Sequence, residues 1–203
     1  MHATARARVT ALLALPLLVL PTACTSDQSA PKHARRTVAS TPVMRGSVPF
    51  RVEVTHVAGR LSAERRAVLS ARVRRTLSSY VDTAFLRTDY PAAHFAGAAR
   101  PFARTLASAV RRDRALLTNA PLAGTTRSVR STHRTAYLSV LAPHGSPAGV
   151  TAAVDLVFAV DRGDRPAQRV ELQGRLLLSP HGGGWRIFGY DLDRSQRPVR
   201  SAS

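Results

Sequence analysis

The chain has 203 residues, 44% of them hydrophobic, and a formal net charge of +18, so it is long enough for one self-supporting domain and basic enough to attract polyanions. Its single cysteine, Cys24, excludes an internal disulfide framework and a cysteine-rich metal site. The arginines are not interleaved with aromatic residues in the way that stacking on bases requires, so nucleic acid is not an expected partner.

Residues 1–23 have the pattern of an export signal. An apolar run at 11–20 follows two early arginines and has about half of the ~20 residues that a membrane-spanning helix needs. The lone Cys24 after Ala23 resembles the bacterial lipoprotein signal. This resemblance implies that Cys24 is acylated and anchors the chain to the cell membrane on its extracytoplasmic face. Because Pro21 stands where that signal usually has Leu, a conventional cleaved signal and an uncleaved anchor stay open as alternatives.

Residues 24–48 are predicted to be a flexible tether, because they are rich in Thr, Ser, Pro and Ala and lack hydrophobic periodicity. A basic cluster at 32–36 lies close to the expected lipid. It would either touch an anionic membrane surface or serve as a solvated spacer.

A single folded domain is expected at 49–193, beginning with a strand at 49–57 where apolar and polar residues alternate. Ser62 then matches a helix N-cap and opens an amphipathic helix of about six turns. The core face of this helix is formed by apolar residues at near-helical spacing, namely Leu69, Val73, Leu77, Val81 and Ala84. A short helix at 92–98 is expected after a break at 89–91.

A third helix is expected from Pro101, which suits a first helical turn. Asp113 lies near the centre of its apolar stripe, which includes Phe102, Val110 and Leu117. A carboxylate in that position is unfavourable unless it is paired or neutral. Two interpretations are therefore open: a cavity group with a raised pKa that acts as a base or hydrogen-bond donor, or an ion pair with one of the many arginines.

After Asn119 the hydrophobic period changes to two, which predicts strands joined by hairpin turns. These strands are expected at 129–141, 150–161, 168–178 and 185–192, and residues 194–203 are expected to be a disordered tail. On the first two strands His133, Tyr137 and Asp155 could converge as a polar cluster in a pocket. The alternative is that they form cross-strand pairs facing solvent.

One strand, three helices and four further strands predict an α+β fold with helices packed on a mainly antiparallel sheet. With this order, the closing run at 184–191, Gly-Trp-Arg-Ile-Phe-Gly-Tyr-Asp, resembles the nuclear transport factor 2-like superfamily, particularly its small exported or membrane-tethered members. The resemblance covers 49–193 and implies a curved, cystatin-like sheet wrapped around the helices as a cone with a cavity. The superfamily contains isomerases and cyclases as well as members without catalysis, so the fold does not choose between them.

The sequence has no histidine pair at metal-ligand spacing, no phosphate-binding loop and no nucleophile motif, so neither a metal nor a cofactor is expected. The favoured hypothesis is a non-catalytic binding or accessory module tethered outside the membrane, which contacts anionic lipid, a wall polymer or a membrane complex. A second hypothesis is a pocket enzyme of the isomerase or cyclase kind with Asp113 or Asp155 as its base. A third is a structural partner that forms a homodimer or binds a membrane protein through its sheet.

Overall fold

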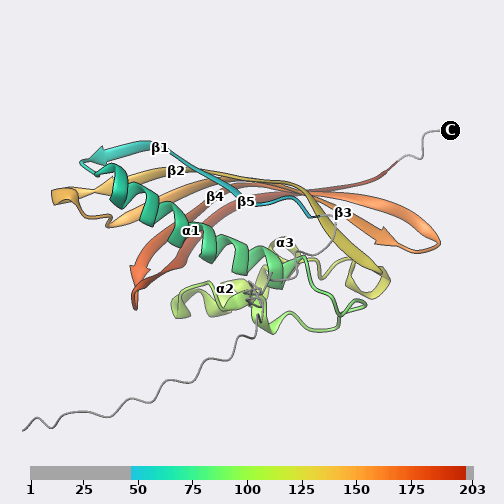
Figure 1. Ribbon diagram of the computed structural model, residues 1–203. Helices are drawn as coiled ribbons and strands as arrows, with labels where there is room; N and C mark the ends of the chain where they lie inside the picture. The colour runs from blue at the N-terminus through green and yellow to red at the C-terminus, as the bar shows by residue number, and fades with distance from the viewer. Residues whose placement is uncertain (1–46, 200–203) are drawn as a thin grey trace, which may run out of the picture. The chain divides into compact units, whose positions relative to one another are not determined.

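A computed structural model describes residues 47–199 of the chain (Figure 1). The predicted export signal, Cys24 and nearly all of the tether lie outside the described residues, and so do residues 200–203. The described part is an α+β arrangement in which the helices lie on one side of a five-stranded mixed sheet. The predicted α+β class is therefore confirmed.

The five strands follow one another in the sheet in the same order as in the chain. They are β1 (Arg51–Gly59), β2 (Ser128–Ala142), β3 (Gly149–Arg162), β4 (Arg165–His181) and β5 (Gly184–Pro198). The pair β1–β2 is parallel because the helices carry the chain back between them, and the other pairs are antiparallel hairpin neighbours. Each strand that the alternating pattern predicts is present.

The predicted disordered tail is wrong over residues 194–198, which continue β5. Arg194 pairs with Leu172 and Pro198 pairs with Gln168 of β4. The segment is polar, so it gives no hydrophobic alternation, but the backbone of β4 supplies hydrogen-bond partners for it. The Arg194 side chain also donates to the carbonyl oxygens of Ala115 and Thr118 at the end of the helical segment.

The long helix α1 (Ala63–Ala84) begins after Ser62 as predicted and has the predicted length of about six turns. The Ser62 hydroxyl accepts a hydrogen bond from the Arg65 backbone N–H at 3.2 Å and so caps the first turn. The expected apolar stripe is buried against the sheet, together with Tyr80. Among the helices of residues 47–199, none combines the length and hydropathy needed to cross a bilayer.

The single helix predicted from Pro101 is wrong, because the chain forms several short helical segments there. They are η2 (Arg104–Leu106), α2 (Ala107–Arg112) and α3 (Arg114–Leu117), followed by η3 (Ala123–Thr125) and, after β2, η4 (Pro143–Gly145). The short helix predicted at 92–98 is present only as η1 (Ala96–Ala99), because residues 92–95 are not helical. Phe102 is not helical but forms an isolated bridge with Ile187 of β5. The Ile187 N–H donates to Pro101 O at 2.9 Å, and the Ala103 N–H donates to Ile187 O at 2.7 Å. These bonds to the sheet occupy the backbone groups that would begin a helix.

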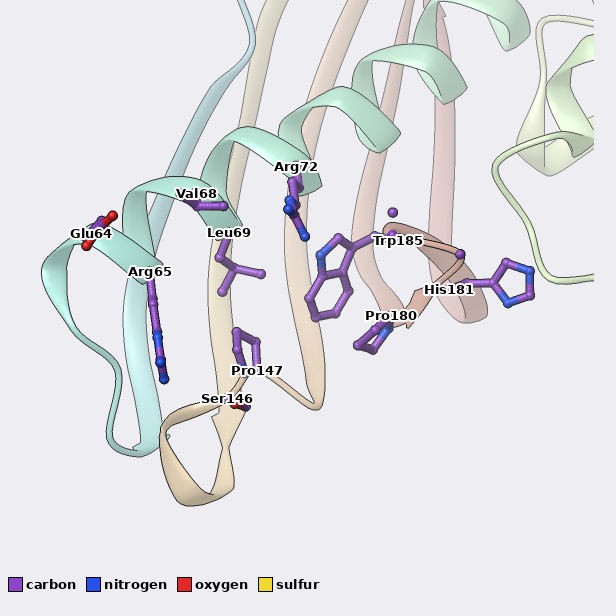
Figure 2. Close-up of a pocket in the computed structure, with 13 residues that line it drawn as sticks. Glu64, Arg65, Val68, Leu69, Arg72, Ser146, Pro147, Pro180, His181 and Trp185 are labelled. Carbon is purple, nitrogen blue, oxygen red and sulfur yellow. The ribbon is translucent and has the colours of Figure 1, made fainter. Parts of the chain in front are cut away.

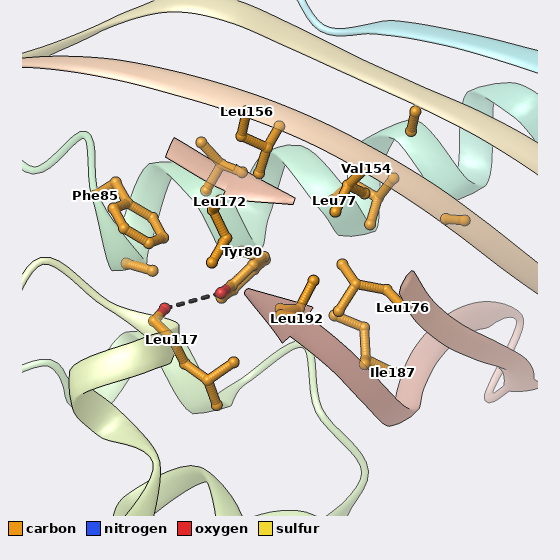
Figure 3. Close-up of a cluster of buried hydrophobic side chains, with 14 of the residues drawn as sticks. Leu77, Tyr80, Phe85, Leu117, Val154, Leu156, Leu172, Leu176, Ile187 and Leu192 are labelled. Carbon is orange, nitrogen blue, oxygen red and sulfur yellow. Dashed lines mark hydrogen bonds between the residues drawn. The ribbon is translucent and has the colours of Figure 1, made fainter. Parts of the chain in front are cut away.

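Apolar side chains fill the space between the middle of α1 and the sheet (Figure 3). The Tyr80 hydroxyl donates to Leu117 O at 2.8 Å and so joins α1 to α3 inside this core. The Phe85 ring stacks on Phe158 of β3 with the ring centroids 4.5 Å apart. The core is therefore packed at this level.

Candidate functional site

The four residues that the sequence offered for catalysis lie on two opposite faces of the sheet. Asp113 lies at the junction of α2 and α3, on the helical side, where it contacts Tyr190. His133, Tyr137 and Asp155 are partly exposed and alternate along their strands with buried residues, so they point to the face that carries no helix. The structure therefore does not bring Asp113 together with the other three.

Asp113 is a hydrogen-bonded carboxylate. The Tyr190 hydroxyl donates to Asp113 Oδ2 at 2.6 Å, and the Arg112 Nε lies 3.3 Å from Asp113 Oδ1. The hydrogen bond from Tyr190, helped by the charge of Arg112, lowers the pKa of Asp113 below its ordinary value. Partial burial and the Asp113 carboxylate raise the pKa of Tyr190 to about 12. Of the two interpretations of the sequence, the cavity group with a raised pKa is wrong, and the geometry matches the ion pair.

His133 and Asp155 form a cross-strand pair on the open face of the sheet. The His133 Nε2 lies 3.5 Å from Asp155 Oδ2, and the Gln173 Nε2 donates to Asp155 Oδ1 at 3.2 Å. Tyr137 lies opposite Ala153 and is 45% exposed. These groups face solvent, as the second interpretation of the sequence expected, and they do not form the wall of an enclosed pocket.

A groove of about 770 Å³ opens at the rim of the domain, between the first half of α1 and the turns that end two hairpins (Figure 2). We call it the rim groove. Its lining consists of Glu64, Arg65, Val68, Leu69 and Arg72 of α1, Ser146 and Pro147 between β2 and β3, and Pro180, His181, Gly182, Gly183, Gly184 and Trp185 around the β4–β5 turn. The sequence predicted the helix and the turn, but nothing in it showed that they are neighbours.

The rim groove has apolar residues at its base and two arginines, Arg65 and Arg72, along its edge. Leu69 and Trp185 are buried at its base, and the Trp185 carbonyl oxygen accepts a hydrogen bond from the Thr76 hydroxyl at 3.2 Å. Arg65 donates through its Nη1 to Gly145 O, which ties α1 to the turn after β2. Within residues 47–199, neither Arg65 nor Arg72 has a carboxylate oxygen within 4 Å. An apolar base and guanidinium groups without a carboxylate partner among the described residues suit a ligand that is both anionic and apolar.

The charge of the domain is concentrated in the helical layer, by which we mean residues 63–117. It holds eleven arginines and four acidic residues. Ten of these arginines are exposed, and among the described residues only Arg112 of the ten has a carboxylate within 4 Å. The other nine are Arg65, Arg66, Arg72, Arg74, Arg75, Arg100, Arg104, Arg111 and Arg114. In the sheet, Arg51, Arg169 and Arg197 pair with glutamates, whereas the exposed Arg130, Arg165 and Arg175 have no carboxylate within 4 Å among the described residues.

Over residues 47–199, no three His, Cys, Asp or Glu side chains are grouped closely enough to hold a metal ion. Comparison of the chain with protein-family models, with curated proteins and with solved structures found no match.

Proposed function

We propose that the chain is a non-catalytic binding module, tethered outside the membrane through Cys24, whose helical layer binds anionic components of the cell envelope. The observation that carries this proposal is the set of nine exposed arginines on the helical side without a carboxylate partner among the described residues. Such residues keep their full charge, and each contributes about 1 kcal/mol of attraction near an anionic membrane surface. The predicted lipoprotein signal would hold this layer within reach of lipid headgroups and wall polymers.

The placement of the candidate catalytic residues supports a binding role over the enzyme hypothesis. The Asp113 carboxylate is held in its charged form by the Tyr190 hydroxyl, and His133 and Asp155 lie on the opposite face of the sheet. A general base near neutral pH needs a pKa close to the working pH, whereas the pKa of Asp113 is lowered. Membership of the nuclear transport factor 2-like superfamily, with its cone-shaped sheet, is part of the proposal and is supported by the order of strands and helices.

Co-sedimentation with vesicles tests this function. The unlipidated chain, residues 24–203 with Cys24→Ser, is expected to sediment with vesicles containing phosphatidylglycerol but not with vesicles of phosphatidylcholine alone. Raising the salt concentration from about 0.05 M to about 0.5 M should release it, because salt screens exposed charges. Equal binding to both vesicle types, or binding to neither of them, would contradict the proposal.

A further inference from the structure

We infer that the rim groove is a specific site for one anionic amphiphile, a molecule with a negatively charged headgroup and an apolar chain. Its headgroup would lie at Arg72 and its chain over Val68 and Trp185. The inference rests on the proposed function, because it assigns one site and one ligand class to part of the helical layer.

The apolar part of the groove supplies a surface for the chain. Val68 is 46% exposed, so its side chain offers apolar surface to a ligand in the groove. It lies beside Leu69, and Figure 2 shows the Trp185 ring and the Pro147 ring facing the same space from the two turns. Covering these surfaces with an acyl chain would remove apolar area from water, which is favourable in proportion to the area covered.

The charged part of the groove supplies a place for the headgroup. Figure 2 shows the Arg72 side chain directed toward Trp185, so a charge beside Arg72 stays close to the apolar wall. Arg65 precedes Arg72 by two helical turns, about 10 Å along the axis, and its bond to Gly145 O fixes it at the other end of the groove. Glu64 is the only acidic residue of the lining, against the two arginines Arg65 and Arg72, so the net charge of the lining favours an anion.

The turn between β4 and β5 keeps the groove open. Gly182 and Gly183 have φ values of +52° and +75°, the conformation that a two-residue hairpin turn of type I′ requires. No atom lies within 4 Å of where a Cβ would stand on either glycine, so the turn borders the groove with bare backbone. The volume of about 770 Å³ lies within the range of about 300–1,000 Å³ that is typical of small-molecule sites.

Trp185 is the only tryptophan of the chain, so its fluorescence reports on this groove directly. We would titrate residues 24–203 carrying Cys24→Ser with dihexanoyl phosphatidylglycerol below its micelle concentration. Two matched probes are dihexanoyl phosphatidylcholine, which has the same chains without the net charge, and glycerol phosphate, which has a charge without the chains. A saturable change is expected with phosphatidylglycerol, and binding at least about tenfold weaker with either of the other two.

Two variants of α1 distinguish specific binding in the rim groove from general attraction of an anion to the positive charge of the domain. Arg72→Gln should weaken phosphatidylglycerol binding about tenfold, since it removes a charged hydrogen-bond donor. Arg74→Gln removes the same charge two residues along, about 200° further around the helix and outside the groove, and should leave binding within about twofold of the parent. Near-ultraviolet circular dichroism would verify that both variants are folded.

Three results would overturn the inference: no saturable change at millimolar phosphatidylglycerol, equal binding of phosphatidylcholine, or equal weakening by Arg72→Gln and Arg74→Gln. The inference and the proposed function can fail separately. Vesicle binding without groove binding would remove the site and leave the helical layer as a membrane-binding surface. Groove binding without vesicle binding would establish the site and contradict the proposed function.

Discussion

The contact between Tyr190 and Asp113 fixes the protonation state of both side chains. The phenol donates a hydrogen bond of 2.6 Å to the carboxylate, which lowers the pKa of Asp113, while the pKa of Tyr190 rises to about 12. The sequence placed Asp113 on an apolar stripe but did not show that β5 brings a tyrosine to it, 77 positions along the chain. This long-range partner is the main reason why the pKa of Asp113 is lowered and not raised.

This contact predicts a pH-dependent stability difference between the parent chain and Tyr190→Phe. The folded-state pKa of Asp113 lies below its unfolded-state value, so its stabilisation is complete above the unfolded pKa of about 4 and is lost as the pH falls through the folded pKa. Tyr190→Phe removes the main cause of that shift. Urea unfolding should therefore show the variant less stable at pH 7, with the difference shrinking toward about pH 3.

Tyr137→Phe is the matched control for this measurement, because Tyr137 is exposed on the face of the sheet away from the helices. It should unfold like the parent at every pH. A difference between Tyr190→Phe and the parent that stayed constant from pH 7 to about pH 3 would show that Asp113 is not stabilised by the phenol.

The secondary-structure elements that could be predicted from the sequence are those that pack against one broad surface. The apolar stripe of α1 and the alternating pattern of β2–β5 each result from burial against a single layer. Hydrophobic periodicity alone was therefore enough to locate these elements. The segment after Pro101 and the end of β5 could not be located in this way. Phe102 is held by a bridge to β5, and residues 194–198 are held by backbone pairing with β4. The rim groove could not be predicted for the same reason, because it forms between α1 and two turns that are distant from α1 in the sequence.

Gly174 provides a test of the observed strand pairing. It lies inside β4 with φ +130°, and a Cβ on it would overlap the backbone oxygen of Asp191 in β5. We therefore expect Gly174→Ala to destabilise the domain by about 3 kcal/mol, through backbone strain together with the clash. The free energy of unfolding in urea is the measurement.

Gly163→Ala separates strain from the clash. Gly163 has φ +64° in the turn between β3 and β4, and no atom lies within 4 Å of where its Cβ would stand. This substitution should lower the free energy of unfolding by only about 1 kcal/mol. Equal effects of the two substitutions would mean that the close approach of β5 to Gly174 is absent in solution.

On the scale of the whole molecule, the helical layer carries more exposed arginines without a carboxylate partner than the strands do, among the described residues. The helical layer presents nine exposed arginines with no carboxylate within 4 Å among the described residues, whereas several exposed arginines of the sheet are paired. A polyanion gains more from the helical layer, because it offers more arginines that need not first be separated from a carboxylate partner. The total charge could be read from the sequence, but its distribution between the two sides depends on the fold.

The most direct test of the central claim compares two variants of equal net charge in binding to phosphatidylglycerol vesicles. One replaces four arginines of the helical layer by glutamine, at Arg74, Arg75, Arg111 and Arg114, and the other replaces four exposed arginines of the strands, at Arg51, Arg130, Arg165 and Arg175. The helical-layer variant should lose at least about tenfold in vesicle affinity, and the strand variant should stay within about threefold of the parent. Equal losses in the two variants would contradict the account, because binding would then follow net charge and not the arginine-rich side of the domain.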